Sequence, residues 1–180
     1  MNLARRQTML AAFGSAALLT TGCMSATNRR PNADGTYCFA TGKTYRRRLT
    51  CTLDPIPSPT VEADALRFEP VEDALTVYVI RDAFRDATYQ VRVESDERAP
   101  MVTTPRSFLR MRLQPGVHTL TAAWPEGRST LEIAGSAGDL LFVELIGTVR
   151  ANGSSFRLLP ADPIDGRRRV PQLRLVADGG

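Results

Sequence analysis

The feature that most constrains the fold of this chain is an alternation of apolar and polar residues from residue 75 onward. In residues 89–94 the apolar side chains stand at 89, 91 and 93, and the polar ones at 90, 92 and 94. A period of two is typical of a strand with one buried face and one wet face. The sequence shows no long helical period beyond its first 22 residues. It therefore predicts an all-β domain.

The predicted strands are short and separated by turn residues. They cover residues 75–81, 89–94, 109–113, 117–122, 129–134, 140–146, 156–160 and 173–176. Some seven or eight strands at this spacing are typical of an antiparallel β-sandwich, of immunoglobulin-like or transthyretin-like type. The link Gln114-Pro115-Gly116 is a turn signal, so we expect residues 109–113 and 117–122 to pair as a hairpin.

The N-terminus reads as an export signal. Arg5 and Arg6 precede an apolar run over residues 9–19, and small residues lead to Cys23. This order is typical of a secretory signal, and its end resembles a bacterial lipobox. The resemblance implies removal of residues 1–22 and a diacylglyceryl chain on Cys23. The motif usually has Leu three places before the Cys, where this chain has Thr20.

Other interpretations of this segment stay open. It could be an ordinary secretory signal that contains a Cys, and Arg5-Arg6 also resembles a twin-arginine signal. A transmembrane helix needs about 20 apolar residues, more than this run offers. The residue after Cys23 is Met24, and the lack of Asp there favours the outer membrane over the inner one. We expect a cell-envelope lipoprotein that faces the periplasm.

Charge gives no support for a nucleic-acid partner. The 180-residue chain has a formal net charge of +4, and loss of Arg5 and Arg6 with the signal lowers it to +2. The remaining 158 residues suffice for one domain with its own core. Lys43 is the only Lys among the basic residues, which we attribute to a GC-rich genome.

The cysteines fit an exported protein. With Cys23 assigned to lipid, Cys38 and Cys51 remain, and an even pair in an exported chain predicts a disulfide. The alternative is two free thiols. With one His in the whole chain and no third thiol, we predict no metal site and no cofactor.

The chain divides into four predicted segments. Residues 1–22 form the signal peptide, and residues 23–35 are small and polar, as in a flexible tether. Residues 36–72 hold the disulfide-closed loop and a connector, in which Pro55, Pro57 and Pro59 favour an extended chain. Residues 73–176 form the sandwich.

The strand set resembles an uncharacterised family of bacterial lipoproteins, the domain of unknown function twenty-eight forty-six. The similar motifs are a strand at residues 77–81, a Leu-x-Pro-Gly-x-His turn at residues 113–118, and an apolar strand at residues 140–146. The resemblance covers roughly residues 73–159. It implies a small β-sandwich and an envelope address, with no known reaction.

His118 is the only candidate for acid–base catalysis. As a general base it needs an orienting acid and a nearby substrate; the alternative is a structural His bonded to a neighbouring loop or backbone. No G-x-S-x-G elbow accompanies it. We interpret the carboxylate pairs Asp82/Asp86 and Asp162/Asp165 as solvated loop charges.

Two arginine runs are candidate anion sites. Guanidinium groups bind phosphate and carboxylate through paired hydrogen bonds, so the runs could meet lipid headgroups; the alternative is a solvated charge run. Their members are Arg46, Arg47, Arg48, Arg167, Arg168 and Arg169. Trp124 could anchor a partner or cap the core.

The sequence thus favours a non-enzymatic, outer-membrane-anchored module with a structural or binding role. Its expected partners are the membrane, through Cys23, and another envelope protein. Two alternatives remain: a binder of a small ligand or anionic glycolipid, and an envelope hydrolase that uses His118.

Overall fold

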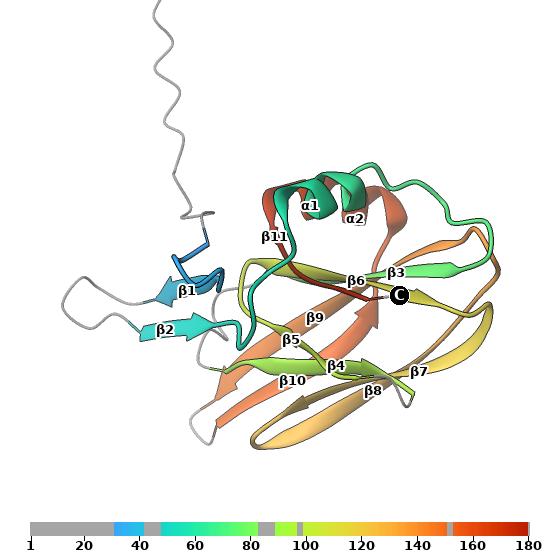
Figure 1. Cartoon of the computed structure of the whole chain (residues 1–180). Coiled ribbons are helices and arrows are strands. Elements are labelled where there is room, and N and C mark those ends of the chain that lie inside the picture. The colour runs from blue at the N-terminus through green and yellow to red at the C-terminus, as the bar shows by residue number, and fades with distance from the viewer. Residues whose placement is uncertain (1–30, 42–47, 83–88, 97–98, 151–152, 180) are drawn as a thin grey trace, which may run out of the picture.

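A computed structural model describes residues 31–41, 48–82, 89–96, 99–150 and 153–179. Two β-sheets lie face to face, and two short helices cover the outer face of one of them (Figure 1). The predicted all-β sandwich is confirmed. Cys23 lies outside the described residues.

The larger sheet has five strands, in the order β10 (Gly153–Pro160), β9 (Leu140–Arg150), β3 (Leu75–Arg81), β6 (Ser107–Leu113) and β11 (Arg174–Gly179). The smaller sheet has four, in the order β5 (Met101–Thr103), β4 (Val91–Ser95), β7 (Gly116–Trp124) and β8 (Gly127–Gly135). A separate hairpin consists of β1 (Cys38–Thr41) and β2 (Arg48–Cys51).

The larger sheet is mixed, because two of its pairs are parallel. β3 runs parallel to β9, and β11 runs parallel to β6. Parallel neighbours need a long crossover connection. The connection from β3 to β9 includes all four strands of the smaller sheet, and the connection from β6 to β11 includes β7 to β10, α2 (Pro163–Arg169) and a 3-10 turn. The remaining pairs are antiparallel.

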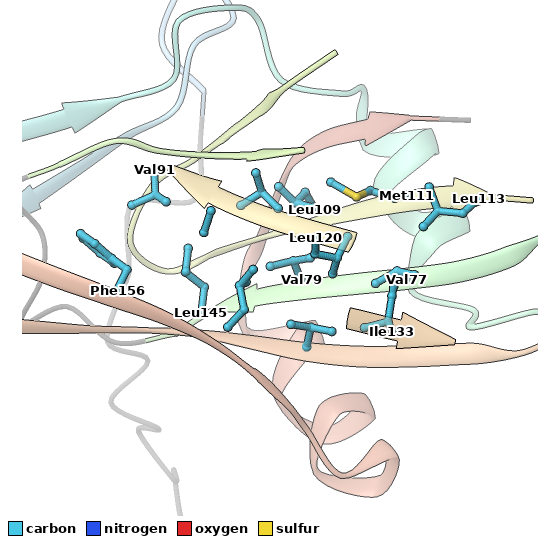
Figure 2. Close-up of a cluster of buried hydrophobic side chains, with 14 of the residues drawn as sticks. Val77, Val79, Val91, Leu109, Met111, Leu113, Leu120, Ile133, Leu145 and Phe156 are labelled. Carbon is cyan, nitrogen blue, oxygen red and sulfur yellow. The ribbon is translucent and has the colours of Figure 1, made fainter. Parts of the chain in front are cut away.

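β3 is the centre of the molecule and is buried along its whole length. Val77 and Val79 face the smaller sheet and join the cluster between the two sheets, which Figure 2 shows. Tyr78 and Ile80 face the helices and join a second cluster with Phe108. A strand covered on both faces reads as a continuous apolar run, which explains the sequence of residues 75–81.

The helices and the turn after them form a cap over this second cluster. The two helices are α1 (Pro59–Ala65) and α2 (Pro163–Arg169). The 3-10 turn η2 (Val170–Gln172) follows α2 directly. We call α1, α2 and η2 the helical cap. Beneath it, the rings of Tyr78 and Phe142 stack at 5.1 Å, and the Phe68 ring packs against both at a tilt, 5.2 and 5.9 Å away.

The predicted hairpin of residues 109–113 and 117–122 is wrong. β6 and β7 belong to different sheets, so the turn before Gly116 carries the chain across the sandwich. Both strands bury apolar residues in the same inter-sheet cluster. The same period-two pattern is therefore expected whether two consecutive strands pair as a hairpin or lie in opposite sheets. β7 pairs instead with β8, and Trp124 lies opposite Gly127 across a two-residue turn.

Helix α1 departs from the extended connector that the prolines predicted. Its first residue is Pro59, and a Pro in the first turn costs nothing because its missing N–H needs no partner there. Ser58 caps the helix by accepting a hydrogen bond from the Val61 amide. Residues 32–36, which overlap the predicted tether, form a turn in which the Gly35 amide donates to the Asn32 carbonyl.

Candidate binding cleft

The β1–β2 hairpin projects from one end of the sandwich (Figure 1). The predicted disulfide is confirmed: Cys38 and Cys51 lie opposite each other in the two strands and are bonded, with an S–S distance of 1.99 Å. Among the described residues, β2 has β1 as its sole strand neighbour. Its other edge has no strand partner in the described part of the chain, and we call it the open edge.

Antiparallel pairing decides which backbone groups stand on this open edge. The Thr52 amide donates to the Tyr37 carbonyl at 2.8 Å, so residues 52 and 50 point their N–H and C=O groups toward β1. Alternate residues point the opposite way. Leu49 and Cys51 consequently direct their backbone groups away from β1.

Two hydrogen bonds order the base of the hairpin, and a third joins the hairpin to the sandwich. Tyr37 is buried, and its amide donates to Thr52 Oγ1 at 3.0 Å. Thr52 Oγ1 donates in turn to the Asp54 carbonyl at 2.8 Å. From the sandwich, Gln90 Nε2 donates to the Cys51 carbonyl at 2.5 Å. The last bond shows that the open edge of β2 faces the start of β4.

A cleft of about 510 Å³ lies where this edge meets the sandwich. We call it the hairpin cleft. Its walls include Leu49, Cys51, Tyr89, Arg92, Ala123 and Trp124. Leu49 is 64% exposed, so its side chain is accessible from the cleft.

The aromatic side of the hairpin cleft is held rigidly. Trp124 Nε1 donates to the Ser154 carbonyl at 3.0 Å, and the Trp124 ring packs edge-on against Phe156 at 5.2 Å. The Tyr89 hydroxyl donates to Glu126 Oε1 at 2.6 Å, and the Ser154 amide donates to Glu126 Oε2 at 2.7 Å. These bonds lower the pKa of Glu126, and the Glu126 carboxylate raises the pKa of Tyr89.

Arg92 supplies the charge of the hairpin cleft. It is exposed on β4, and within the described part of the chain it forms no ion pair. Register places Ala123 directly opposite Arg92 and Arg128 directly opposite Ala123, so both arginines lie on one sheet face. A small residue between them leaves the Arg92 guanidinium accessible.

The arginine run of α2 behaves differently. Arg169 donates to Glu144 at 2.5 Å and to Asp165 at 3.2 Å. These bonds raise the pKa of Arg169, and the bond to Glu144 is the main cause. Arg168 pairs with Asp165 at 2.5 Å. Arg167 stands over the Phe68 ring at 5.4 Å. Each of the three thus has a partner within the chain.

The arginine run at residues 46–48 is only partly described by the structure. Arg46 and Arg47 lie outside the described residues, and Arg48 is described through its backbone alone, as the first residue of β2. The side chains of this run therefore lie outside the described part of the structure.

Arg110 is the most enclosed ion-paired arginine of the cap region. It donates from Nε to Asp178 at 2.7 Å, from Nη2 to the same carboxylate at 2.9 Å, and from Nη1 to Asp64 at 2.8 Å. Burial alone would lower the pKa of Arg110, but Asp178 and Asp64 outweigh it and raise that pKa. Arg110 in turn lowers the pKa of Asp64.

His118 has the orienting acid that a general base requires, but its second nitrogen is also engaged. Nδ1 lies 2.6 Å from Asp96 Oδ2, and Nε2 lies 2.7 Å from the Gln114 carbonyl oxygen. The Thr119 amide and His118 lower the pKa of Asp96. Both ring nitrogens face acceptors, so the geometry is that of a structural clasp between β7 and two loops.

The other predicted chemical groups also have local roles. Asp82 pairs with Arg106 and, at 3.3 Å, with Arg169. Asp162 caps α2 by accepting from the Ile164 and Asp165 amides. Asp86 lies outside the described residues. Within the described ranges, no three His, Cys, Asp or Glu side chains are grouped to hold a metal ion.

A second hollow of about 460 Å³ lies between the proline-rich connector and the strands β5 and β11. Leu53 stands in its wall and is 56% exposed. The charged side chains among its described wall residues, Asp54 and Asp178, are acidic, and Asp178 is paired with Arg110. This hollow offers less for a ligand than the hairpin cleft does.

The comparison with known proteins gave no relative: no protein-family model matches the chain, and no curated protein sequence matches it either. No helix in the described ranges has the length and apolar character needed to cross a membrane.

Sequence reasoning missed most of the hairpin cleft. It singled out Trp124 and Cys51, but not Leu49, Gln90 or Arg92. Arg92 looked like any polar residue on the wet face of an alternating strand. Only the register of three strands and the position of the hairpin bring it beside Trp124.

Proposed function

We propose that this chain is a non-enzymatic, lipid-anchored module of the bacterial cell envelope that binds a partner in the hairpin cleft. The observation that carries the proposal is the composition of that cleft: Arg92, which has no ion pair among the described residues, lies beside a highly exposed Leu49 and a rigid Trp124. A fixed aromatic side chain, an apolar side chain and an arginine are typical of the residues that dominate binding energy.

The anchor rests on the sequence alone. The basic start, the apolar run and Cys23 support export and lipidation, and the disulfide between Cys38 and Cys51 suits an oxidising compartment. Met24, in place of an Asp, favours the outer membrane; that position and a periplasm-facing orientation stay predictions. So does membership of the lipoprotein family that the strands resemble.

Binding is a better proposal than hydrolysis because of the geometry at His118. A general base needs a ring nitrogen that is free to take a proton from a nucleophile. Here one nitrogen faces Asp96, and the other faces the Gln114 carbonyl. The hairpin cleft does not include His118.

A second candidate function uses the same cleft for a small anionic ligand or glycolipid. It is favoured by the volume of about 510 Å³, which falls in the range of small-molecule sites, and by the positive charge of Arg92. The two candidates differ in what contacts Leu49.

Site-specific photocrosslinking in intact cells separates them. A photoreactive amino acid replaces Leu49 in one variant and Leu159 in a control; Leu159 is 43% exposed on β10 and lies outside the cleft. The proposal expects a discrete protein adduct from position 49 and none from 159. Adducts only with lipid or glycan support the second candidate. The same adduct from both positions, or none from 49, contradicts binding in the cleft.

Lipid labelling tests the anchor separately. We expect radioactive palmitate to enter the wild-type chain and not Cys23→Ser. Equal labelling of the two chains contradicts lipidation of Cys23.

A further inference from the structure

We propose that the hairpin cleft takes an extended acidic peptide segment, which adds as a strand to the open edge of β2 and places an Asp or Glu carboxylate on Arg92. This inference rests on the proposed function and names the chemistry of its partner. Three features support it: the backbone of β2, the side chains of the cleft and the sequence of the hairpin.

The backbone of β2 provides the first step. Leu49 directs its N–H and C=O away from β1, and Cys51 does the same with its N–H. An unpaired edge is a template for another strand, and extended peptides bind sheet edges in this way. The Cys51 carbonyl already accepts from Gln90, which marks one end of the available edge.

The side chains of the cleft provide the second step. A strand that lies on this edge directs alternate side chains into the cleft. Trp124 and Leu49 there offer apolar contacts, and Arg92 offers a guanidinium that a carboxylate can bind through two hydrogen bonds. Among the described residues that line the cleft, Arg92 alone is charged. A peptide with an apolar residue near an acidic one complements this arrangement.

The sequence of β2 argues against a second copy of this chain as the occupant. β2 consists of Arg48, Leu49, Thr50 and Cys51, so a second β2 strand has no carboxylate to place on Arg92. An acidic segment supplies that carboxylate. The disulfide between Cys38 and Cys51 holds the template in its extended form before binding, which lowers the entropy cost of association.

The test begins with a probe of defined chemistry. A library of random twelve-residue peptides is selected on the full chain, extracted from the envelope in detergent. Binding of the selected peptides is then followed through the fluorescence of Trp124, the only Trp of the chain. We expect selected sequences that contain Asp or Glu near β-branched or aromatic residues.

Four variants then locate the bound peptide. Arg92→Glu should weaken binding by roughly tenfold or more, as expected for loss of a charge-assisted pair. Arg157→Glu is its matched control, because Arg157 is exposed on β10 outside the cleft. Leu49→Pro removes the outward N–H and spares the bonds to β1, so binding should again fall roughly tenfold. Leu49→Ala keeps that N–H and should lose less.

The peptide supplies a complementary test. Methylation of its backbone nitrogens one at a time should abolish binding at alternate positions, those that face β2, and spare the positions between them. Near-ultraviolet circular dichroism and a thiol assay confirm that every protein variant keeps its fold and its disulfide.

Several results would overturn the inference. These are equal losses in Arg92→Glu and Arg157→Glu, full affinity in Leu49→Pro, binding of phosphatidylglycerol vesicles or glycans where no peptide is selected, and dimer formation through β2. If position 49 still crosslinks a protein in cells, such a result removes the strand-addition mode and leaves the proposed function standing. If it crosslinks nothing, the proposed function fails as well.

Discussion

The region under the helical cap and the hairpin cleft both contain arginine, but they use it in opposite ways. Arg110, under the cap, has three charge-assisted bonds to Asp178 and Asp64, and Arg169 reaches Glu144 and Asp165. Arg92, in the cleft, has no ion pair within the described residues. The difference indicates that the arginines of the cap hold elements together, whereas Arg92 is available to a partner.

The largest expected effect comes from breaking the network under the cap. Arg110→Ala leaves Asp178 without its two-bond partner in a site where the Arg110 side chain is only 6% exposed. Removal of one partner from a buried pair typically costs about 3–5 kcal/mol, and we expect a loss of that size in urea unfolding. Arg168→Ala is the control, because Arg168 is 74% exposed and its pair should contribute less than about 1 kcal/mol. Equal losses would remove the distinction between enclosed and exposed arginines.

The next effect concerns the covalent link of the hairpin. Replacement of Cys38 and Cys51 by Ser removes a crosslink between residues 13 apart in sequence. The chain-entropy model predicts a loss of roughly 3 kcal/mol, measurable by urea unfolding. Peptide binding in the cleft should fall in the same variant, because the β2 edge loses its constraint. Unchanged binding would show that the disulfide does not prepare the edge.

A smaller effect is expected from acid. Arg110 holds the pKa of Asp64 below its usual 3.8, so Asp64 is more acidic in the folded chain than in the unfolded one. Its contribution to stability is therefore complete above about pH 5 and is lost as the pH falls through the lowered pKa. We expect the fall in unfolding free energy below about pH 4 to be shallower in Asp64→Asn than in the wild type. A slope that Asp64→Asn leaves unaltered would contradict this role of Arg110.

The smallest expected effect on stability belongs to Arg92. Arg92→Glu should change the unfolding free energy by no more than about 0.5 kcal/mol, as is usual for an exposed residue without specific partners. A loss close to that of Arg110→Ala would show that Arg92 holds the fold together as Arg110 does, and would contradict the difference between the two regions. The informative pair of measurements is thus stability, which Arg110 governs, and binding, which Arg92 governs.

The sequence predicted the parts of this molecule whose cause is local. Alternation at residues 89–94 and 109–113 identified β4 and β6, and the even pair of cysteines identified the disulfide. The pair Ser58-Pro59 is compatible with the start of a helix and with an extended connector. Only the packing of Ala65 and Phe68 over Tyr78 decides between the two.

Partnerships between distant segments could not be predicted in the same way. Leu109 and Leu120 bury their side chains in one cluster whether their strands pair or face each other across the sandwich. The cleft depends on such partnerships, since Gln90 reaches across 39 residues to the Cys51 carbonyl. Arg92 therefore carried no local signal of its position.

The central claim is that the edge of β2 is open and becomes paired when a partner binds. Amide hydrogen exchange at Leu49 and Thr50, followed by NMR with and without the tightest selected peptide, tests it most directly. In the free chain, Thr50 should exchange slowly because its amide points toward β1, and Leu49 should exchange fast. The peptide should slow Leu49 by about tenfold or more and alter Thr50 little. A Leu49 amide that is already protected in the free chain, or one that the peptide leaves unchanged, would contradict the account.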